Sequence, residues 1–322
     1  MPFAFDAYVT DARFDRSGLV VFALGDGTVR WEDGRQLQAH DGAVLCAAAH
    51  PSGEGLITGG DDGRLAWSRP EGTETLAEIK GRWIDVVASS AASGLIAFAA
   101  GRDVMVRDVK DPKVAITLSH ERTVAGLDFD PKGRRLAAAT YGGAALWYAR
   151  IAEQKPQVLK WAGSHVLVAF SPDGRFLVSG MQENELHGWR LADGSNMRLG
   201  GYPSKVKSLV FLDKGRLMAT AGAAGAVIWP FSGSSGPMGK QAAEVGYQEG
   251  ALVTRVAALP SAARIFAGLN DGRVWSCELG GTKVDHLKAE KGEPISALAV
   301  SPDGRRVAWG DEAGEAGVAE LP

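Results

Sequence analysis

A short glycine-containing turn recurs along this chain at a nearly constant spacing. The turn is present as DRSG (15–18), PSG (51–53), ASG (92–94), DPKG (130–133), SPDG (171–174), LDKG (212–215) and SPDG (301–304). The glycines follow one another at steps of 35, 41, 39, 41 and 41 residues, and a last step of 89 residues spans two periods with LPSA (259–262) between them. A fixed period of this length is the signature of a repeat architecture, so we expect eight similar units.

Each unit is predicted to consist of short strands. Proline and aspartate favour the central positions of a β-turn, and glycine relieves the strain that follows. Alternating apolar runs such as HVLVAFS (165–171) and RFLVSG (175–180) flank the turn, and a second turn such as NDGRVW (270–275) leads into a third strand. That third strand usually contains tryptophan, at positions 31, 67, 147, 189, 229 and 275. Because no long stretch has helical periodicity, we predict an all-β protein.

Small antiparallel sheets have two faces to bury and edges to protect, and radial stacking achieves both. We therefore predict one domain, 1–322, folded as a single closed β-propeller of four-stranded antiparallel blades. Eight blades are expected, with seven as the alternative. The approximate repeats are 8–42, 43–82, 83–122, 123–164, 165–205, 206–253, 254–294 and 295–322. Because the last unit ends without residues for an outer strand, residues 2–6 are predicted to supply that strand.

These repeats resemble those of the WD-repeat family. The best-matching segments are FSPDGRFLVSG (170–180), VSPDGRRVAWG (300–310), DPKGRRLAAATYGGAALW (130–147) and GGDDGRLAW (59–67). The Trp-Asp dipeptide itself is mostly lost, since Trp31 precedes Glu32 and Trp67 precedes Ser68. The resemblance implies a platform that binds other proteins and has no catalytic activity.

The resemblance also implies a buried network of His, Ser or Thr, Asp and Trp within a blade. Only the second repeat approaches this set, with His40, Thr58, Asp62 and Trp67. Trp67 comes one residue early, and side chains alternate between the two faces of a strand. We therefore expect Trp67 to face away from the other three residues.

Charge and composition limit the classes of partner. The chain has 35 basic and 38 acidic residues, and a net charge of −3 offers no general attraction to nucleic acid or anionic lipid. The N-terminal segment does not resemble a signal peptide, and no apolar stretch is long enough to span a membrane. Two cysteines, Cys46 and Cys277, fit a reducing compartment. We expect a cytoplasmic protein that binds neither nucleic acid nor membranes.

No motif for catalysis, metal or cofactor stands out. The six histidines show no metal-ligand spacing, and Cys46 and His50 lie about 13 Å apart along an extended strand, too far to share one ion. GPMGK (236–240) lacks the spacing and the Ser or Thr of a phosphate-binding loop. The segment 232–250 that contains it is predicted to be a flexible surface loop, and partner binding is the function considered for it. We predict no metal, no cofactor and no enzyme activity.

The predicted binding residues belong to the loops that precede each first strand and join each second strand to the third, which share one face of a WD-repeat propeller. They are Lys80, Arg82, Trp83, Arg102, Tyr141, Trp161, Tyr202 and Lys205. Packing between blades is the alternative role for Trp83 and Trp161, and plain solvation is the alternative for the charged residues. Two rival functions stay open. One is an enzyme or metal-site protein acting at the channel mouth, and the other is a reader of peptides or modified residues in a channel widened by Ala47–Ala49 and Ala257–Ala258.

Overall fold

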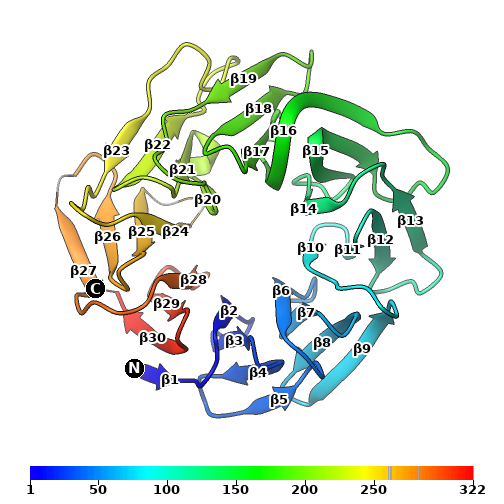
Figure 1. Cartoon of the computed structure of the whole chain (residues 1–322), viewed down its shortest axis with the longest axis horizontal. Helices are drawn as coiled ribbons and strands as arrows, with labels where there is room; N and C mark the ends of the chain where they lie inside the picture. Colours follow the sequence, from blue (N-terminus) through cyan, green and yellow to red (C-terminus); the bar gives the residue numbers. More distant parts are fainter. Residues whose placement is uncertain (260, 262, 282, 322) are drawn as a thin grey trace.

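The computed structural model describes residues 1–259, 261, 263–281 and 283–321, and its strands are arranged in a ring (Figure 1). The predicted turn at 259–262 includes positions 260 and 262, which lie outside the described residues. A 3₁₀ turn, η1 (Asp213–Gly215), is the one helical element among the described residues. The prediction of an all-β propeller is confirmed.

The strands follow one another around the ring in chain order (Figure 1). The first four groups are β2 (Val9–Phe14), β3 (Val20–Leu24), β4 (Thr28–Trp31) and β5 (Gln36–Gln38); β6 (Val44–Ala49), β7 (Leu56–Gly60), β8 (Arg64–Arg69) and β9 (Gly72–Glu78); β10 (Val86–Ser90), β11 (Leu95–Ala100), β12 (Asp103–Asp108) and β13 (Ala115–Ser119); and β14 (Val124–Phe129) with β15 (Arg135–Tyr148). Then come β16 (Gln157–Phe170), β17 (Phe176–Met181), β18 (Leu186–Arg190) and β19 (Asn196–Leu199); β20 (Leu209–Leu212), β21 (Leu217–Thr220), β22 (Ala226–Pro230) and β23 (Ala243–Val245); β24 (Val253–Ala257), β25 (Arg264–Leu269), β26 (Val274–Glu278) and β27 (Val284–Lys288); and β28 (Ile295–Val300), β29 (Arg306–Asp311) and β30 (Glu315–Glu320), with β1 (Pro2–Ala4) beside β30.

Hydrogen bonding divides these strands into seven antiparallel sheets, six of four strands and one of six, which runs from β14 to β19. The first half of β15 pairs with β14 and its second half pairs with β16, whose own second half pairs with β17. The two ends of β15 meet, since Ala149 N donates to Arg134 O at 2.9 Å, and Gly142 and Gly143 have φ values of +92° and +139°. The strand therefore turns back on itself within the sheet.

The expectation of eight separate blades is wrong. Seven sheets, the number given as the alternative, form the ring, and the six-stranded sheet spans two of the eight sequence repeats because pairing continues through β16. We number the repeats around the ring as units 1 to 8. Unit 3 is β10–β13, unit 4 is β14 to the first half of β16, unit 5 is the rest of β16 to β19, and unit 8 is β28–β30 with β1.

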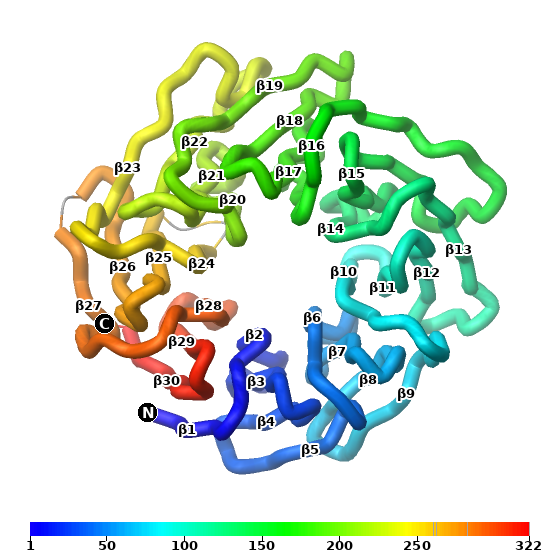
Figure 2. The backbone as a smooth tube through the Cα atoms, in the orientation of Figure 1, coloured from blue at the N-terminus to red at the C-terminus, as the bar shows by residue number. Residues whose placement is uncertain are grey.

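The two ends of the chain meet in unit 8 (Figure 2). Pro2 pairs with Gly317 and Ala4 with Glu315, so β1 is the outer strand beside β30. The guanidinium of Arg306 in unit 8 donates to the Glu32 carboxylate in unit 1, with an Nη1 to Oε1 distance of 3.0 Å. The N-terminal strand and this ion pair both join the last unit of the ring to the first.

The core lies between neighbouring units, where one residue of each unit recurs at an equivalent position. The residue lies at or just before the first strand of its unit and is at most 2% exposed. The eight residues are Val9, Val44, Ile84, Val124, His165, Val206, Val253 and Ile295. Glycine in the second strand of the preceding unit makes room for several of them, since a Cβ on Gly310 would lie 2.4 Å from Val9 Cγ1 and one on Gly268 would lie 2.4 Å from Ile295 Cγ2.

Candidate binding face

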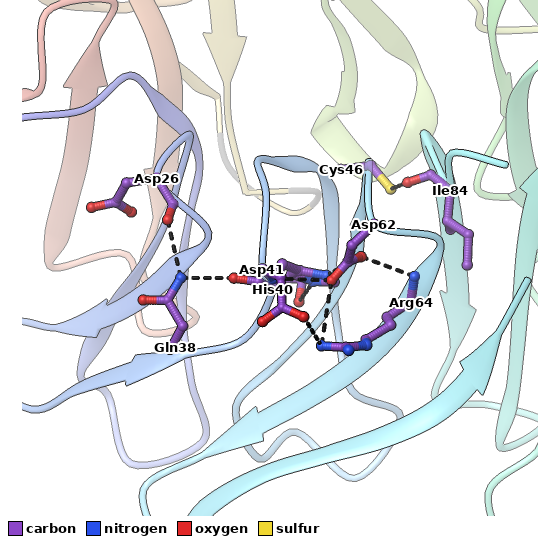
Figure 3. Close-up of polar contacts among 9 residues, drawn as sticks. Asp26, Gln38, His40, Asp41, Cys46, Asp62, Arg64 and Ile84 are labelled. Atoms are coloured by element: carbon purple, nitrogen blue, oxygen red, sulfur yellow. Dashed lines mark hydrogen bonds and ion pairs between the residues drawn. The ribbon is translucent and has the colours of Figure 1, made fainter. Parts of the chain in front are cut away.

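A buried histidine network fixes the loops of unit 2 (Figure 3). His40 Nδ1 lies 3.0 Å from Asp62 Oδ1, and His40 Nε2 lies 2.9 Å from Thr58 Oγ1. Burial alone raises the pKa of Asp62, but hydrogen bonds from the Arg64 and Asp41 N–H groups and from His40 outweigh burial and hold this pKa below its ordinary value. The network joins the loop before β6 to the loop between β7 and β8.

Trp67 lies outside that network, as the strand alternation predicted. Its indole Nε1 donates to Glu54 O at 2.8 Å, and its ring stacks on His50 with centroids 3.9 Å apart. Arg69 covers the ring at 4.0 Å. His40, Thr58 and Asp62 therefore form the set that the family resemblance implies, without its tryptophan.

Unit 6 contains a related network that the sequence interpretation did not identify. Tyr202 Oη lies 2.7 Å from Thr220 Oγ1, and Trp229 Nε1 donates to Tyr202 Oη at 2.6 Å. Burial raises the pKa of Tyr202 to about 12. Tyr202, one of the predicted binding residues, is 8% exposed, so little of its side chain is in contact with solvent.

The junction of units 4 and 5 is chemically different from the other junctions. His165 occupies the position that Val or Ile takes in the other seven units, and its Nδ1 lies 2.6 Å from Ser179 Oγ. The ring of Trp161 stacks on His187 with centroids 3.9 Å apart. His187 is fully buried, and neither of its ring nitrogens has a hydrogen-bond partner among the residues that the structure describes. Burial, and to a smaller extent the nearby His165, lower the pKa of His187 to about 4.

Two neighbouring cavities open where the loops of units 3 and 4 meet the segment 160–162, which leads into unit 5. The first has a volume of about 720 Å³, and its lining includes Arg82, Trp83 and Arg102. The second has a volume of about 830 Å³, and its lining includes Tyr141 and Trp161. Five of the eight predicted binding residues therefore line these two cavities. Glu121 and Arg122 line both cavities and connect them, and the sequence interpretation did not select either residue.

The backbone joins these loops directly. His120 N donates to Arg102 O at 3.0 Å, and Val124 N donates to Gly101 O at 2.9 Å. The loop before β14 thus lies against the loop between β11 and β12. We call the surface formed by 80–85, 101–102, 120–123, 140–143 and 160–162 the unit 3–5 face.

Large aromatic side chains are exposed on this face. Trp83 and Tyr141 are each 64% exposed. Most of the Trp83 ring is therefore in solvent, which does not favour packing between blades as its role. Trp161, in contrast, is half-buried and stacks on His187. Large apolar groups in contact with solvent often mark surfaces that bind other molecules.

The charged candidates differ in their surroundings. Arg82 Nη1 lies 3.0 Å from Asp103 Oδ2, whereas no carboxylate of a described residue forms an ion pair with Arg102 or Arg122. Lys80 is exposed beside the first cavity without lining it, and Lys205 is half-buried before unit 6. The loops of units 3 and 4 therefore contain two arginines that have no ion-pair partner among the described residues.

The remaining sequence candidates lie elsewhere. The segment 232–250 is an outer connection of unit 6 that includes strand β23, and its Lys240 Nζ donates to Ser232 O, so the segment is ordered in part. Among the residues that the structure describes, no three His, Cys, Asp or Glu side chains gather as they would around a metal ion. The same residues include no helix with the length and apolar character needed to cross a membrane.

Comparisons with known proteins give a repeat and a fold. Residues 31–66, which include His40, Thr58 and Asp62, match the family described as WD domain, G-beta repeat. No curated protein matches the chain. A crystal structure of the computationally designed Ika8 protein is similar, with a TM-score of 0.78 and 18% identity over 99% of this chain and 98% of that one. At this identity the likeness concerns the fold alone.

Proposed function

We propose that this WD-repeat β-propeller is a non-catalytic platform that binds other proteins through the unit 3–5 face. The observation that supports this most strongly is the exposure of Trp83 and Tyr141 beside two adjoining cavities. Tryptophan, tyrosine and arginine dominate the energy of protein interfaces because they bury large areas and donate directed hydrogen bonds.

The scaffold beneath this face is closely packed. Ile84 and Val124, which follow Trp83 and Arg122 closely in the chain, are fully buried between units. Paired strands hold both ends of these loops, so the loop backbone loses little conformational freedom when a partner binds. Preorganisation of this kind lowers the entropic cost of association.

Removal of the two exposed aromatic rings tests the proposal. The double variant Trp83→Ala/Tyr141→Ala is expected to lose a protein that co-purifies with the wild type from its native cells, because each central aromatic contributes about 2 kcal/mol or more, roughly thirtyfold in Kd. Quantitative mass spectrometry of the co-purified proteins measures the loss.

Tyr148→Ala is the matched control. Tyr148 is 59% exposed at the end of β15 and lines neither cavity, so its replacement removes an exposed aromatic ring that is not part of the cavity walls. The control should retain every partner. Partners that bind the double variant and the wild type equally would refute the assignment of this face.

We also propose that the partners are cytoplasmic. The free thiols of Cys46 and Cys277 support a reducing compartment, and burial raises the pKa of both thiols above the ordinary value, which favours the unreactive thiol form. Fractionation of native cells tests the location. Recovery of the protein in a secreted or membrane fraction would contradict it.

A further inference from the structure

The loops of the propeller face are unevenly charged. In units 3 and 4 they contain four basic residues, Lys80, Arg82, Arg102 and Arg122, against two acidic ones, Asp85 and Glu121. In unit 8 the corresponding loops contain Glu290, Glu293 and Glu312 against Lys291. A chain with a net charge of −3 thus presents a basic sector on the same face as an acidic one.

The basic sector coincides with the cavities. Arg102 and Arg122 both line the first cavity, Arg122 also lines the second, and Lys160 lines the second as well. Because no carboxylate of a described residue pairs with Arg102 or Arg122, both guanidinium groups have donors available for an external acceptor. Arginine presents its N–H groups in a planar fork that fits a carboxylate with two parallel hydrogen bonds.

Apolar surface adjoins these charges. Trp83 in the first cavity, and Tyr141 and Val158 in the second, are exposed, and the two cavities meet at Glu121 and Arg122. An occupant that uses both cavities therefore needs apolar groups to cover the rings and carboxylates to meet the arginines. A compact ion meets only the second requirement.

From this arrangement we infer that the unit 3–5 face recognises an acidic peptide segment with apolar side chains among its carboxylates, placed across the two cavities so that Arg102 and Arg122 bind its acidic groups. The inference rests on the proposed function and narrows it to one class of partner segment. The acidic sector in unit 8 repels the same segment, and the contrast orients it toward units 3 and 4.

Fluorescence anisotropy of the intact protein with synthetic peptides tests the inference. The probe is a labelled glutamate-rich peptide with leucines at its centre, and the reference is the same peptide with lysine in place of every glutamate. The acidic peptide is expected to bind with an affinity that falls as salt rises, and the basic peptide is expected not to bind. No binding of the acidic peptide, or equal binding of both, would overturn the inference.

Charge reversal locates the site. Arg102→Glu/Arg122→Glu should weaken binding of the acidic peptide by roughly a hundredfold or more, since two attractive contacts become repulsive. Lys110→Glu/Lys132→Glu is the control, because both lysines are exposed in loops at the opposite ends of the strands and the change in net charge is the same. An equal effect of both double variants would show attraction to overall charge and would overturn the assigned site.

Two further results separate this inference from its neighbours. A single-stranded oligonucleotide is anionic and stacks on aromatic rings. Tighter binding of an oligonucleotide than of the peptide would show that the face binds nucleic acid and would overturn the inference. If the acidic peptide fails to bind while Trp83→Ala/Tyr141→Ala still loses a co-purifying protein, the acidic class of segment is wrong and the proposed function stands.

Discussion

Replacement of Gly310 by alanine should open the junction at which the ring closes. Gly310 lies in β29 of unit 8, and its Cβ would lie 2.4 Å from Cγ1 and 2.6 Å from Cβ of Val9 in unit 1. Carbon atoms in good contact lie about 3.5–4.0 Å apart, so the two strands must separate by roughly 1 Å or Val9 must leave its site. Val9 is fully buried, and its carbonyl oxygen accepts a hydrogen bond from Ser296 Oγ at 2.7 Å, which opposes either movement.

Overpacking of this kind costs about 1–3 kcal/mol of unfolding free energy. Urea unfolding followed by tryptophan fluorescence measures the cost. Gly200→Ala is the matched control, since a Cβ on Gly200 meets no atom within 4 Å. The control should change stability by less than about 0.5 kcal/mol. The combination Gly310→Ala/Val9→Ala should be less destabilised than the sum of its single changes, because both changes act on one contact.

Two results would refute this prediction: unfolding of Gly310→Ala at the same urea concentration as the wild type, or equal destabilisation of Gly200→Ala. Either result would mean that neighbouring units do not pack through this contact. An additive double variant would mean that Val9 does not meet the new methyl group.

Three further changes test individual groups. Burial raises the pKa of Asp128 to about 7, so the wild type should lose stability as pH rises from about 4 through 7. Asp128→Asn should lack this loss and be the more stable protein at pH 8 by up to about 4 kcal/mol. The same dependence of the urea unfolding free energy on pH in both proteins would contradict this prediction. Thr58→Val removes the partner of His40 Nε2 and should cost about 1–3 kcal/mol in thermal or urea unfolding. Arg306→Gln breaks the ion pair with Glu32 and should lower the unfolding free energy in urea by about 1–3 kcal/mol. An unchanged unfolding free energy would show that the pair contributes nothing to ring closure.

The sequence predicted the elements whose cause is local. Turn glycines such as Gly174 and Gly304 have φ values of +69° and +73°. Glycine adopts such values without strain, so the glycines in the sequence indicate where the turns lie. The position of Trp67 was also predictable, because strand side chains alternate and one displaced residue changes face. The WD-repeat resemblance is confirmed by the match at 31–66 and by the ring of antiparallel sheets.

What depends on pairing between distant residues was harder to predict. The Tyr-Gly-Gly turn at 141–143 gave no sign that pairing would continue into β16, because that continuity depends on the register between units 4 and 5. Tyr202 was selected for its position in a loop, yet it lies 18 residues before Thr220, the same spacing as between His40 and Thr58. That shared spacing was the available sign of a buried hydrogen-bonding role.

The binding surface combines predicted and unpredicted residues for the same reason. Arg82, Trp83 and Arg102 could be selected from their positions before and between strands. Glu121 and Arg122 join the two cavities only because the loop before β14 folds against the loop between β11 and β12. A contact between loops of different units is a property of the ring, and the local pattern in each unit does not determine it.

Site-specific cross-linking in native cells tests the binding face most directly. A photoreactive amino acid is placed at position 83 in one protein and at position 148 in another, since both native side chains are largely exposed. We expect a partner protein to be captured from position 83 and not from position 148. Capture of the same partner from position 148 with none from position 83 would contradict it.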